Sequence, residues 1–259
     1  YLTMIVPAIW LKPDKAKIYH LLTSYQILKL RCFNNTNTNK MFHGHAQTPT
    51  SIFHLVKKNT NNIIKIYDNN QFCDYFLKEE IPIPLMGISI INKLQKYVND
   101  VGSLKVHKSN LPSKHIEIFE KKKHDSNYKN ITTCILNKKI PEMVFNYSFV
   151  PCPFYKKPKL VLAHGMYGFP FLDHHGMYGI SNRDKYVIMD KSIDDLKRLR
   201  SFLSTNLALY LFETTKYRMK YLEKYIFELI PDITKIKDFP IYIDDQTIAE
   251  FFQFSKDEI

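Results

Sequence analysis

Residues 1–10 read YLTMIVPAIW, and the fold class of this chain is inferred from this segment outward. Leu2–Trp10 is an apolar run of strand length, and the pair Lys12-Pro13 ends it. Such a run without polar alternation is typical of a strand buried on both faces of a layered sheet. Because the chain opens inside this strand and has no initiator Met, we expect it to be a fragment of a longer protein.

Elements of alternating type follow this strand. The pattern predicts a helix over Lys15–Ser24 and strands over Gln26–Phe33, Thr50–Lys57 and Ile63–Tyr67, with a polar loop at 34–40. A strand, a helix and a strand followed by hairpin-like strands are typical of the closing half of a layered α/β sheet. The polar and proline-rich residues 69–84 suit neither a helix nor a central strand, so we expect a domain boundary near residue 72.

Residues 73–259 predict a second domain of the α+β class. Apolar spacing predicts helices over Ile88–Val98, from Ser192 through Leu211, over Lys216–Leu229 and over Asp245–Phe252, and short strands over Lys159–Ala163 and Lys185–Met189. Lys105–Lys139 is basic and predicts mainly loop. Two copies of HGMYG, at 164–168 and 175–179, predict a compact β-meander with glycine turns.

The charge of the chain indicates a polyanionic partner. The 259 residues contain 37 Lys and Arg against 25 Asp and Glu, a formal net charge of +12. Nucleic acid is the commonest partner of so basic a chain. The alternative is a solubilising lysine coat, which an AT-rich coding sequence would produce by codon bias alone.

The cysteine and apolar patterns bear on the compartment. Cys32, Cys73, Cys134 and Cys152 are far apart and form no CxxC pair, which favours a reducing compartment, the cytoplasm of a viral or bacterial system. No window approaches 18 uninterrupted apolar residues, so we expect no transmembrane helix and no membrane partner.

The absence of the corresponding motifs excludes several classes of site. His43-Gly44-His45 and His174-His175 have no Cys or carboxylate at ligand spacing, so we interpret them as loop histidines and expect no metal site. A G-x-S-x-G elbow, a P-loop and a Rossmann glycine fingerprint do not occur in the sequence.

Three features, in order along the chain, resemble adenine-N6 DNA methyltransferases of the restriction–modification type. Residues 1–10 look like the fifth sheet strand of that family, which follows its catalytic Asn-Pro-Pro-Tyr segment. Met41-Phe42, leading into the strand at 48–57, resembles the loop and returning strand that flank the flipped base. Residues 159–162, Pro170-Phe171 and 176–182 followed by Tyr186-Val187-Ile188 resemble the target-recognition domain.

The resemblance implies a fold and a separate role for each of two domains. Residues 1–72 would be the closing strands of a Rossmann-like methyltransferase sheet, and residues 73–259 an α+β target-recognition domain. The glycine-rich cofactor loop and Asn-Pro-Pro-Tyr are absent from this sequence. We therefore expect the parent protein to use S-adenosylmethionine, and this chain alone to hold no catalytic residue and to bind no cofactor.

The implied partners are double-stranded DNA and a restriction nuclease domain or subunit. The alternative from another class is a non-catalytic DNA-binding specificity module. Methylation of a base in duplex DNA requires its extrusion, and an aromatic ring recovers part of that cost by stacking. The resemblance places Phe42 in that role, with a hydrophobic plug at the loop base as the alternative.

The expected DNA contacts lie between residues 156 and 183. Lysines on the approach to a strand suit phosphate contacts, and polar residues in turns suit base edges, although a solvated turn is the alternative for each of the latter. The expected DNA-binding residues are Lys156, Lys157, Lys159, His164, Tyr178, Ser181, Asn182 and Arg183.

Overall fold

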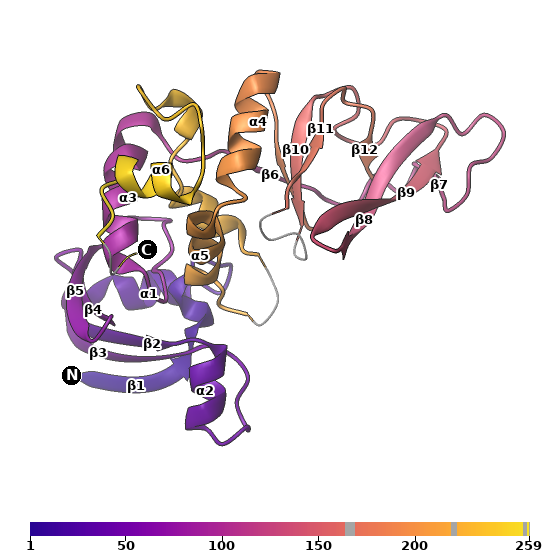
Figure 1. The fold of residues 1–259 in the computed structure, drawn as a ribbon. Coiled ribbons are helices and arrows are strands. Elements are labelled where there is room, and N and C mark those ends of the chain that lie inside the picture. The colour runs from indigo at the N-terminus through magenta and orange to yellow at the C-terminus, as the bar shows by residue number, and fades with distance from the viewer. Residues whose placement is uncertain (164–168, 219–221, 256–257, 259) are drawn as a thin grey trace. The chain divides into compact units, whose positions relative to one another are not determined.

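The structure is a computed structural model that describes residues 1–163, 169–218, 222–255 and 258 (Figure 1). It is a mixed α/β structure with three sheets, as the sequence predicts at the level of class. The chain forms two compact units. Unit 1 comprises Tyr1–Ser103, Tyr210–Pro231 and Phe252–Ile259, and unit 2 comprises Leu104–Leu209 and Asp232–Phe251.

Unit 1 is built on a five-stranded mixed sheet. Its strands are β1 (Leu2–Pro7), β2 (Tyr25–Phe33), β3 (Thr50–Asn59), β4 (Ile63–Asp68) and β5 (Gln71–Phe76), in the spatial order β1-β3-β2-β4-β5. β3 is antiparallel to both β1 and β2, and β4 is parallel to β2. Three strands, β1, β2 and β4, therefore run in one direction. The connection from β1 to β2 contains η1 (Ala8–Leu11) and α1 (Ile18–Thr23).

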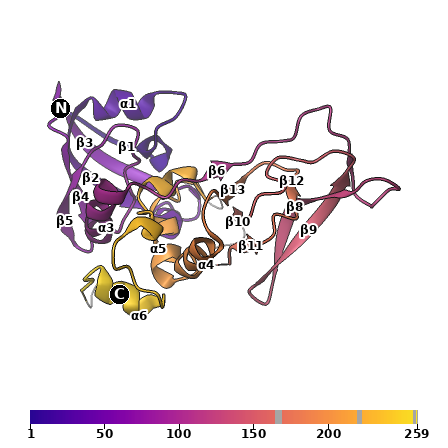
Figure 2. The ribbon, with the colours of Figure 1, turned by 90° about the horizontal axis from the view of Figure 1, so that it is seen from above.

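The core of unit 1 lies on the sheet and beneath α3 (Ile88–Val101), which contacts β5 (Figure 2). Ile27, Leu30 and Ile66, on strands that the sequence predicts, are completely buried. Gly87, with φ +74°, precedes α3, and a Cβ there would lie 2.8 Å from the Tyr210 ring. Tyr210 belongs to a late segment of unit 1, so this glycine lets two distant parts of the sequence pack closely.

The first strand is not buried on both faces, and that expectation is wrong. β1 is an edge strand that pairs with β3 alone, and Ile5 on it is 57% exposed. Leu2 and Met4 are exposed as well. An apolar run shows that side chains can be buried, but it does not show which element covers them.

Three further segments differ from expectation. Residues 34–40 are not a loop: α2 (Asn35–Met41) forms there, because the Asn34 side chain accepts a hydrogen bond from the Asn37 amide at 2.9 Å and caps it. The long helix expected after Ser192 is divided into α4 (Ile193–Phe202) and α5 (Asn206–Thr214). The Lys216–Leu229 helix is replaced, in its described part, by the short η2 (Lys224–Glu228).

Unit 2 contains two four-stranded sheets. The first has the order β11-β10-β13-β6 and the second the order β12-β8-β9-β7. The strands are β6 (His107–Lys108), β7 (Ile118–Phe119), β8 (Tyr128–Asn137), β9 (Ile140–Ser148), β10 (Lys159–Ala163), β11 (Phe171–Asp173), β12 (Gly179–Ile180) and β13 (Lys185–Ile188). The predicted strands at 159–163 and 185–189 are confirmed.

An apolar cluster joins the two sheets of unit 2. Ile131 and Ile180 come from one sheet and Val161 and Val187 from the other, and all four are completely buried. The helical elements of this unit are α4, the first turn of α5, η3 (Ile233–Lys235) and α6 (Asp245–Phe251). The predicted N-terminus of α4 is confirmed, because Ser192 accepts a hydrogen bond from the Asp195 amide at 3.1 Å.

The β8–β9 hairpin begins in Lys105–Lys139, which the sequence predicts mainly as loop: β8 and the turn lie within that range, and β9 lies beyond it (Figure 2). Its two-residue turn is Lys138-Lys139, and both lysines have positive φ, 47° and 68°. The expected domain boundary, residue 72, lies within β5. Among the described residues, no helix is both long enough and apolar enough to cross a bilayer.

Candidate nucleic-acid interface

A hollow of about 690 Å³ lies in unit 1 where the parallel strands β2 and β4 end. Carboxyl ends of parallel strands are the usual place for ligands in open α/β sheets. Arg31 and Asn34 line this hollow from the end of β2, and Tyr67 and Asp68 line it from the end of β4. The end of α2 contributes Met41.

The chemistry of this hollow suits a planar polar ligand. The guanidinium of Arg31 lies 4.5 Å from the centre of the Tyr67 ring. Asn69 and Asn70, which form the tight turn between β4 and β5, add amide groups to the lining. Stacked cation and aromatic planes bind base faces, and amides bind base edges.

Phe42, the expected stacking residue, is the C-terminal cap of α2. Its amide donates to the Thr38 oxygen at 3.0 Å, and its own carbonyl accepts from His45 at 2.9 Å. The side chain is 36% exposed and directly follows Met41 at the hollow. The partly exposed Phe42 therefore follows, in the sequence, a residue that lines the hollow. Phe42 itself is not one of the lining residues of the hollow.

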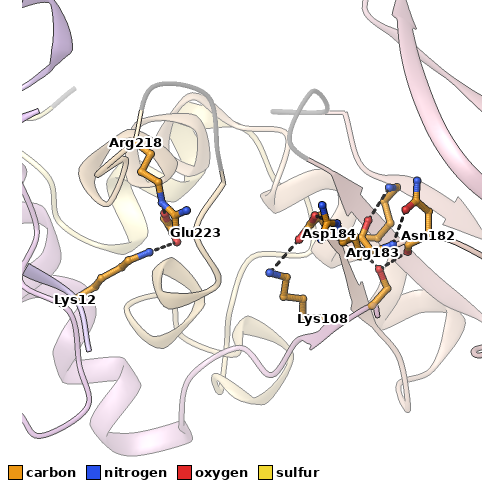
Figure 3. Close-up of polar contacts among 9 residues, drawn as sticks. Lys12, Lys108, Asn182, Arg183, Asp184, Arg218 and Glu223 are labelled. Atoms are coloured by element: carbon orange, nitrogen blue, oxygen red, sulfur yellow. Dashed lines mark hydrogen bonds and ion pairs between the residues drawn. The ribbon is translucent and has the colours of Figure 1, made fainter. Parts of the chain in front are cut away.

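In unit 2, Asn182 and Arg183 lie in the turn that leads into β13 (Figure 3). Ser109 holds this turn by donating its hydroxyl to the Asn182 carbonyl at 2.8 Å and accepting from the Lys185 amide at 3.0 Å. Arg183 has a side chain that is 70% exposed. The turn is thus fixed at its base and open at its tip.

The same turn borders a second hollow, of about 380 Å³. Asn182, Arg183 and Asp184 form one side of it, and Thr133 and Cys134 of β8 form another. Lys185, which the sequence does not single out, lines it as well.

Lys156 and Lys157 are exposed, as phosphate-contacting lysines must be. The amide of Lys156 donates to the Gly176 carbonyl at 2.9 Å, which links this segment to the second HGMYG copy. Gly176 has φ +67°, and a Cβ there would lie 2.6 Å from the Lys157 nitrogen. Only glycine permits that close approach of the two chain segments.

Lys159 differs from its two neighbours, and the expectation for it is corrected. It is 0% exposed, and its ammonium lies 2.5 Å from Asp173 Oδ2. Burial lowers the pKa of Lys159, while the hydrogen bond and charge of Asp173 act in the opposite direction. A lysine enclosed in this way is not available to a DNA phosphate.

Tyr178 and Ser181 are more enclosed than base-reading residues would be. The Tyr178 ring packs 4.7 Å from the Phe145 ring, centre to centre, beside the unit 2 core. Ser181 is buried and donates its hydroxyl to the Ile131 carbonyl at 3.3 Å. His164 and the whole first HGMYG copy lie outside the described residues.

The tip of the β8–β9 hairpin is a basic surface that the sequence analysis missed. Lys138 and Lys139 are exposed at the turn, flanked by the exposed side chains of Ile135 and Ile140. A two-stranded ribbon fits the major groove of B-DNA. The alternating residues on both sides of Asn137-Lys138-Lys139 were the available signal for this hairpin. The signal was overlooked because lysine rarely occupies such a two-residue turn.

Neither comparison with known proteins identifies a relative: no protein-family model matches the sequence, and no curated protein matches it. Within the described part of the chain, no group of three His, Cys, Asp or Glu side chains is placed to hold a metal ion.

Proposed function

We propose that this chain is the DNA-recognition part of a site-specific adenine-N6 DNA methyltransferase. The observation that carries the proposal is the arrangement of β1, β2 and β3 around the Phe42 loop. The returning strand β3 lies between β1 and β2 and is antiparallel to both. The loop that precedes it holds Phe42, which directly follows Met41, a residue that lines the hollow of unit 1.

The exposed apolar edge of β1 also supports this proposal. An unpaired edge with exposed Leu2, Met4 and Ile5 is what a sheet presents when further strands continue it. We propose that those strands supply the Rossmann-like remainder of the catalytic domain. The S-adenosylmethionine site and the Asn-Pro-Pro-Tyr segment, both absent from this sequence, would belong to them.

Unit 2 supplies the target recognition in this proposal. The exposed Lys156 and Lys157 contact phosphates, and the open Asn182-Arg183 turn and the Lys138-Lys139 tip approach the grooves. Double-stranded DNA is the partner, a restriction nuclease is the functional companion, and the cytoplasm is the compartment. The second candidate, a specificity module without any catalytic half, shares these contacts and differs only in having no methyltransferase to serve.

The proposal is tested through Phe42. Stacking on an extruded base is worth about 1–3 kcal/mol, which corresponds to about fivefold to about 150-fold in affinity. The wild-type chain should bind a duplex with one unpaired adenine more tightly than the fully paired duplex. Phe42→Ala should abolish this preference.

The matched control is Phe76→Ala, which removes an exposed ring from β5 of the same sheet. It should leave the preference intact. A preference that survives Phe42→Ala, or that Phe76→Ala removes equally, would contradict the assigned role.

A further inference from the structure

Lys185 is the second buried lysine of unit 2, and its surroundings differ from those of Lys159. It is 6% exposed, at the start of β13. Within the described part of the chain, its ammonium has one hydrogen-bond acceptor, the Arg183 carbonyl at 3.1 Å. An ammonium can donate three hydrogen bonds.

Among the described residues, no carboxylate forms an ion pair with Lys185 as Asp173 does with Lys159. The nearest acidic residue in sequence, Asp184, lies 3.0 Å from the Lys108 ammonium and 3.4 Å from Arg183 Nε (Figure 3). Burial lowers the pKa of Lys185, while Cys134 and Asp184 act in the opposite direction. A buried ammonium of this kind is costly unless an anion accompanies it.

The hollow beside Lys185 has the space and the donors for such an anion. It measures about 380 Å³, and Asn182, Arg183 and Thr133 of β8 line it. Asp184 lines it as well, and its carboxylate is paired with the Lys108 ammonium and the Arg183 guanidinium. The β8–β9 pairing shifts register between Ile131 and Thr133, which interrupts the ladder at the hollow. Ladder irregularities of this kind often lie next to functional sites, where they redirect side chains.

We propose that this hollow is a phosphate-binding site, in which the Lys185 ammonium and the Arg183 guanidinium receive the oxygens of one phosphate group. Lys185 supplies a buried point charge from below, and Arg183 supplies a planar fork of donors from the exposed rim. Ser109 fixes the turn between them, so the site is formed before the ligand arrives.

If the proposed function holds, the ligand is a DNA backbone phosphate. The inference rests on the proposed function only for this source of the phosphate group. A free phosphate compound offers the same chemistry. The experiment therefore has one arm for phosphate itself and one for DNA.

The first arm titrates the full chain with inorganic phosphate at constant ionic strength, with acetate as the comparison anion. Phosphate should raise the melting temperature and broaden the ³¹P resonance, and acetate should do neither. Lys185→Arg should retain the effect. Lys185→Met should lose it, and so should Arg183→Gln, whose exposed position should leave folding intact. Lys156→Gln, an exposed lysine of the same unit, should behave as wild type.

The second arm measures the salt dependence of duplex binding. If the ligand is a backbone phosphate, inorganic phosphate competes with DNA, and Arg183→Gln lowers the slope of log K against log salt by about one. Phosphate that raises the melting temperature without competing with DNA would keep the site and overturn the backbone assignment.

The outcomes separate this inference from the proposed function. Phosphate protection that persists in Lys185→Met and Arg183→Gln, or that is absent from the wild type, overturns the site while DNA binding stands. A wild type that is protected by phosphate but binds no DNA retains the site and overturns the proposed function.

Discussion

At the residue scale, the Lys159–Asp173 pair organises the turn that follows β11. Besides the Lys159 ammonium, the Asp173 carboxylate accepts hydrogen bonds from the amides of Met177 at 2.9 Å and Tyr178 at 3.1 Å. Each oxygen of this almost fully buried carboxylate therefore has a donor. The pair serves folding rather than DNA contact.

The first prediction concerns the stability that this pair provides. Asp173→Ala leaves the Lys159 ammonium buried and unpaired, so it should lower the free energy of unfolding by about 3–5 kcal/mol. Lys159→Met leaves the carboxylate two amide donors, so its cost should be smaller, about 1–3 kcal/mol. Urea denaturation measures both. Equal costs, or a loss of DNA salt dependence in a folded Lys159→Met, would contradict this account.

Burial at the residue scale is also where the sequence misled. Lys156, Lys157 and Lys159 form one basic run, and nothing in their order shows that only the third points into the protein. The decisive partner, Asp173, is 14 residues away and is brought close by the β10–β11 pairing. Lys185 was missed for the same reason, because its pocket is assembled from β8 and β13.

At the element scale, the β8–β9 hairpin shows local conflict. A two-residue turn with positive φ at both positions favours Asn-Gly, and this chain places two lysines there. Non-glycine residues in such conformations are costly and often mark functional sites. Charge at the tip is therefore maintained at the expense of turn stability.

The second prediction follows from this conflict. Replacing the tip by Lys138→Asn with Lys139→Gly should raise the free energy of unfolding by about 1 kcal/mol, because the new residues suit the turn. The same double variant should bind duplex DNA more weakly, with a salt slope reduced by up to about two. Lys58→Gln, an exposed lysine of β3, serves as the charge control. Unchanged DNA binding by the double variant would remove the hairpin from the interface.

The third prediction concerns the residues that begin η3. Burial acts to raise the pKa of Asp232, but hydrogen bonds from Lys191 and Thr234, together with the lysine charges, outweigh it, and the pKa lies below 3.8. The carboxylate oxygens lie 2.8 and 2.9 Å from the Lys191 ammonium. Because the folded-state pKa is depressed, this stabilisation is present above the unfolded pKa and is lost as pH falls below it.

Asp232→Asn should therefore lower the free energy of unfolding by about 3 kcal/mol near neutral pH. The difference from wild type should shrink as the pH falls below about 4. Thermal denaturation between pH 7 and pH 2.5 measures it. Asp194→Asn, which removes an exposed i,i+3 pair with Lys197, should change little at any pH. A pH-independent cost for Asp232→Asn would contradict the assigned ion pair.

Elements with strong local signals could be predicted from the sequence. Which other elements pack over them could not. The strands at β2, β3, β10 and β13 and the helices α3 and α6 follow from apolar periodicity. The division between α4 and α5 depends on the Thr205 hydroxyl, which accepts from the Ala208 amide at 3.3 Å and starts a new helix. Leucine spacing continues across that point, so periodicity alone predicts one helix.

At the scale of the whole molecule, both units carry an excess of positive charge, and the proposed function depends on it. The formal charge of +12 gives electrostatic attraction to any polyanion, and the exposed lysines and Arg183 make it available to phosphate. If the lysines form only a solubilising coat, the chain has no specific phosphate site, and no single lysine substitution should weaken DNA binding more than another. Comparison of Arg183→Gln and the Lys138→Asn, Lys139→Gly double variant with the Lys58→Gln control distinguishes the two possibilities.

The fourth prediction is for the fluorescence anisotropy of a labelled duplex, measured with the intact chain over a series of salt concentrations. We expect a dissociation constant of about 10⁻⁴–10⁻⁶ M at physiological salt, with log K falling linearly as log salt rises. Labelled S-adenosylmethionine in the same samples should give no methyl transfer, because the sequence lacks Asn-Pro-Pro-Tyr. Absent or salt-independent binding would contradict the DNA-recognition role, and methyl transfer would show that the catalytic centre lies within these residues.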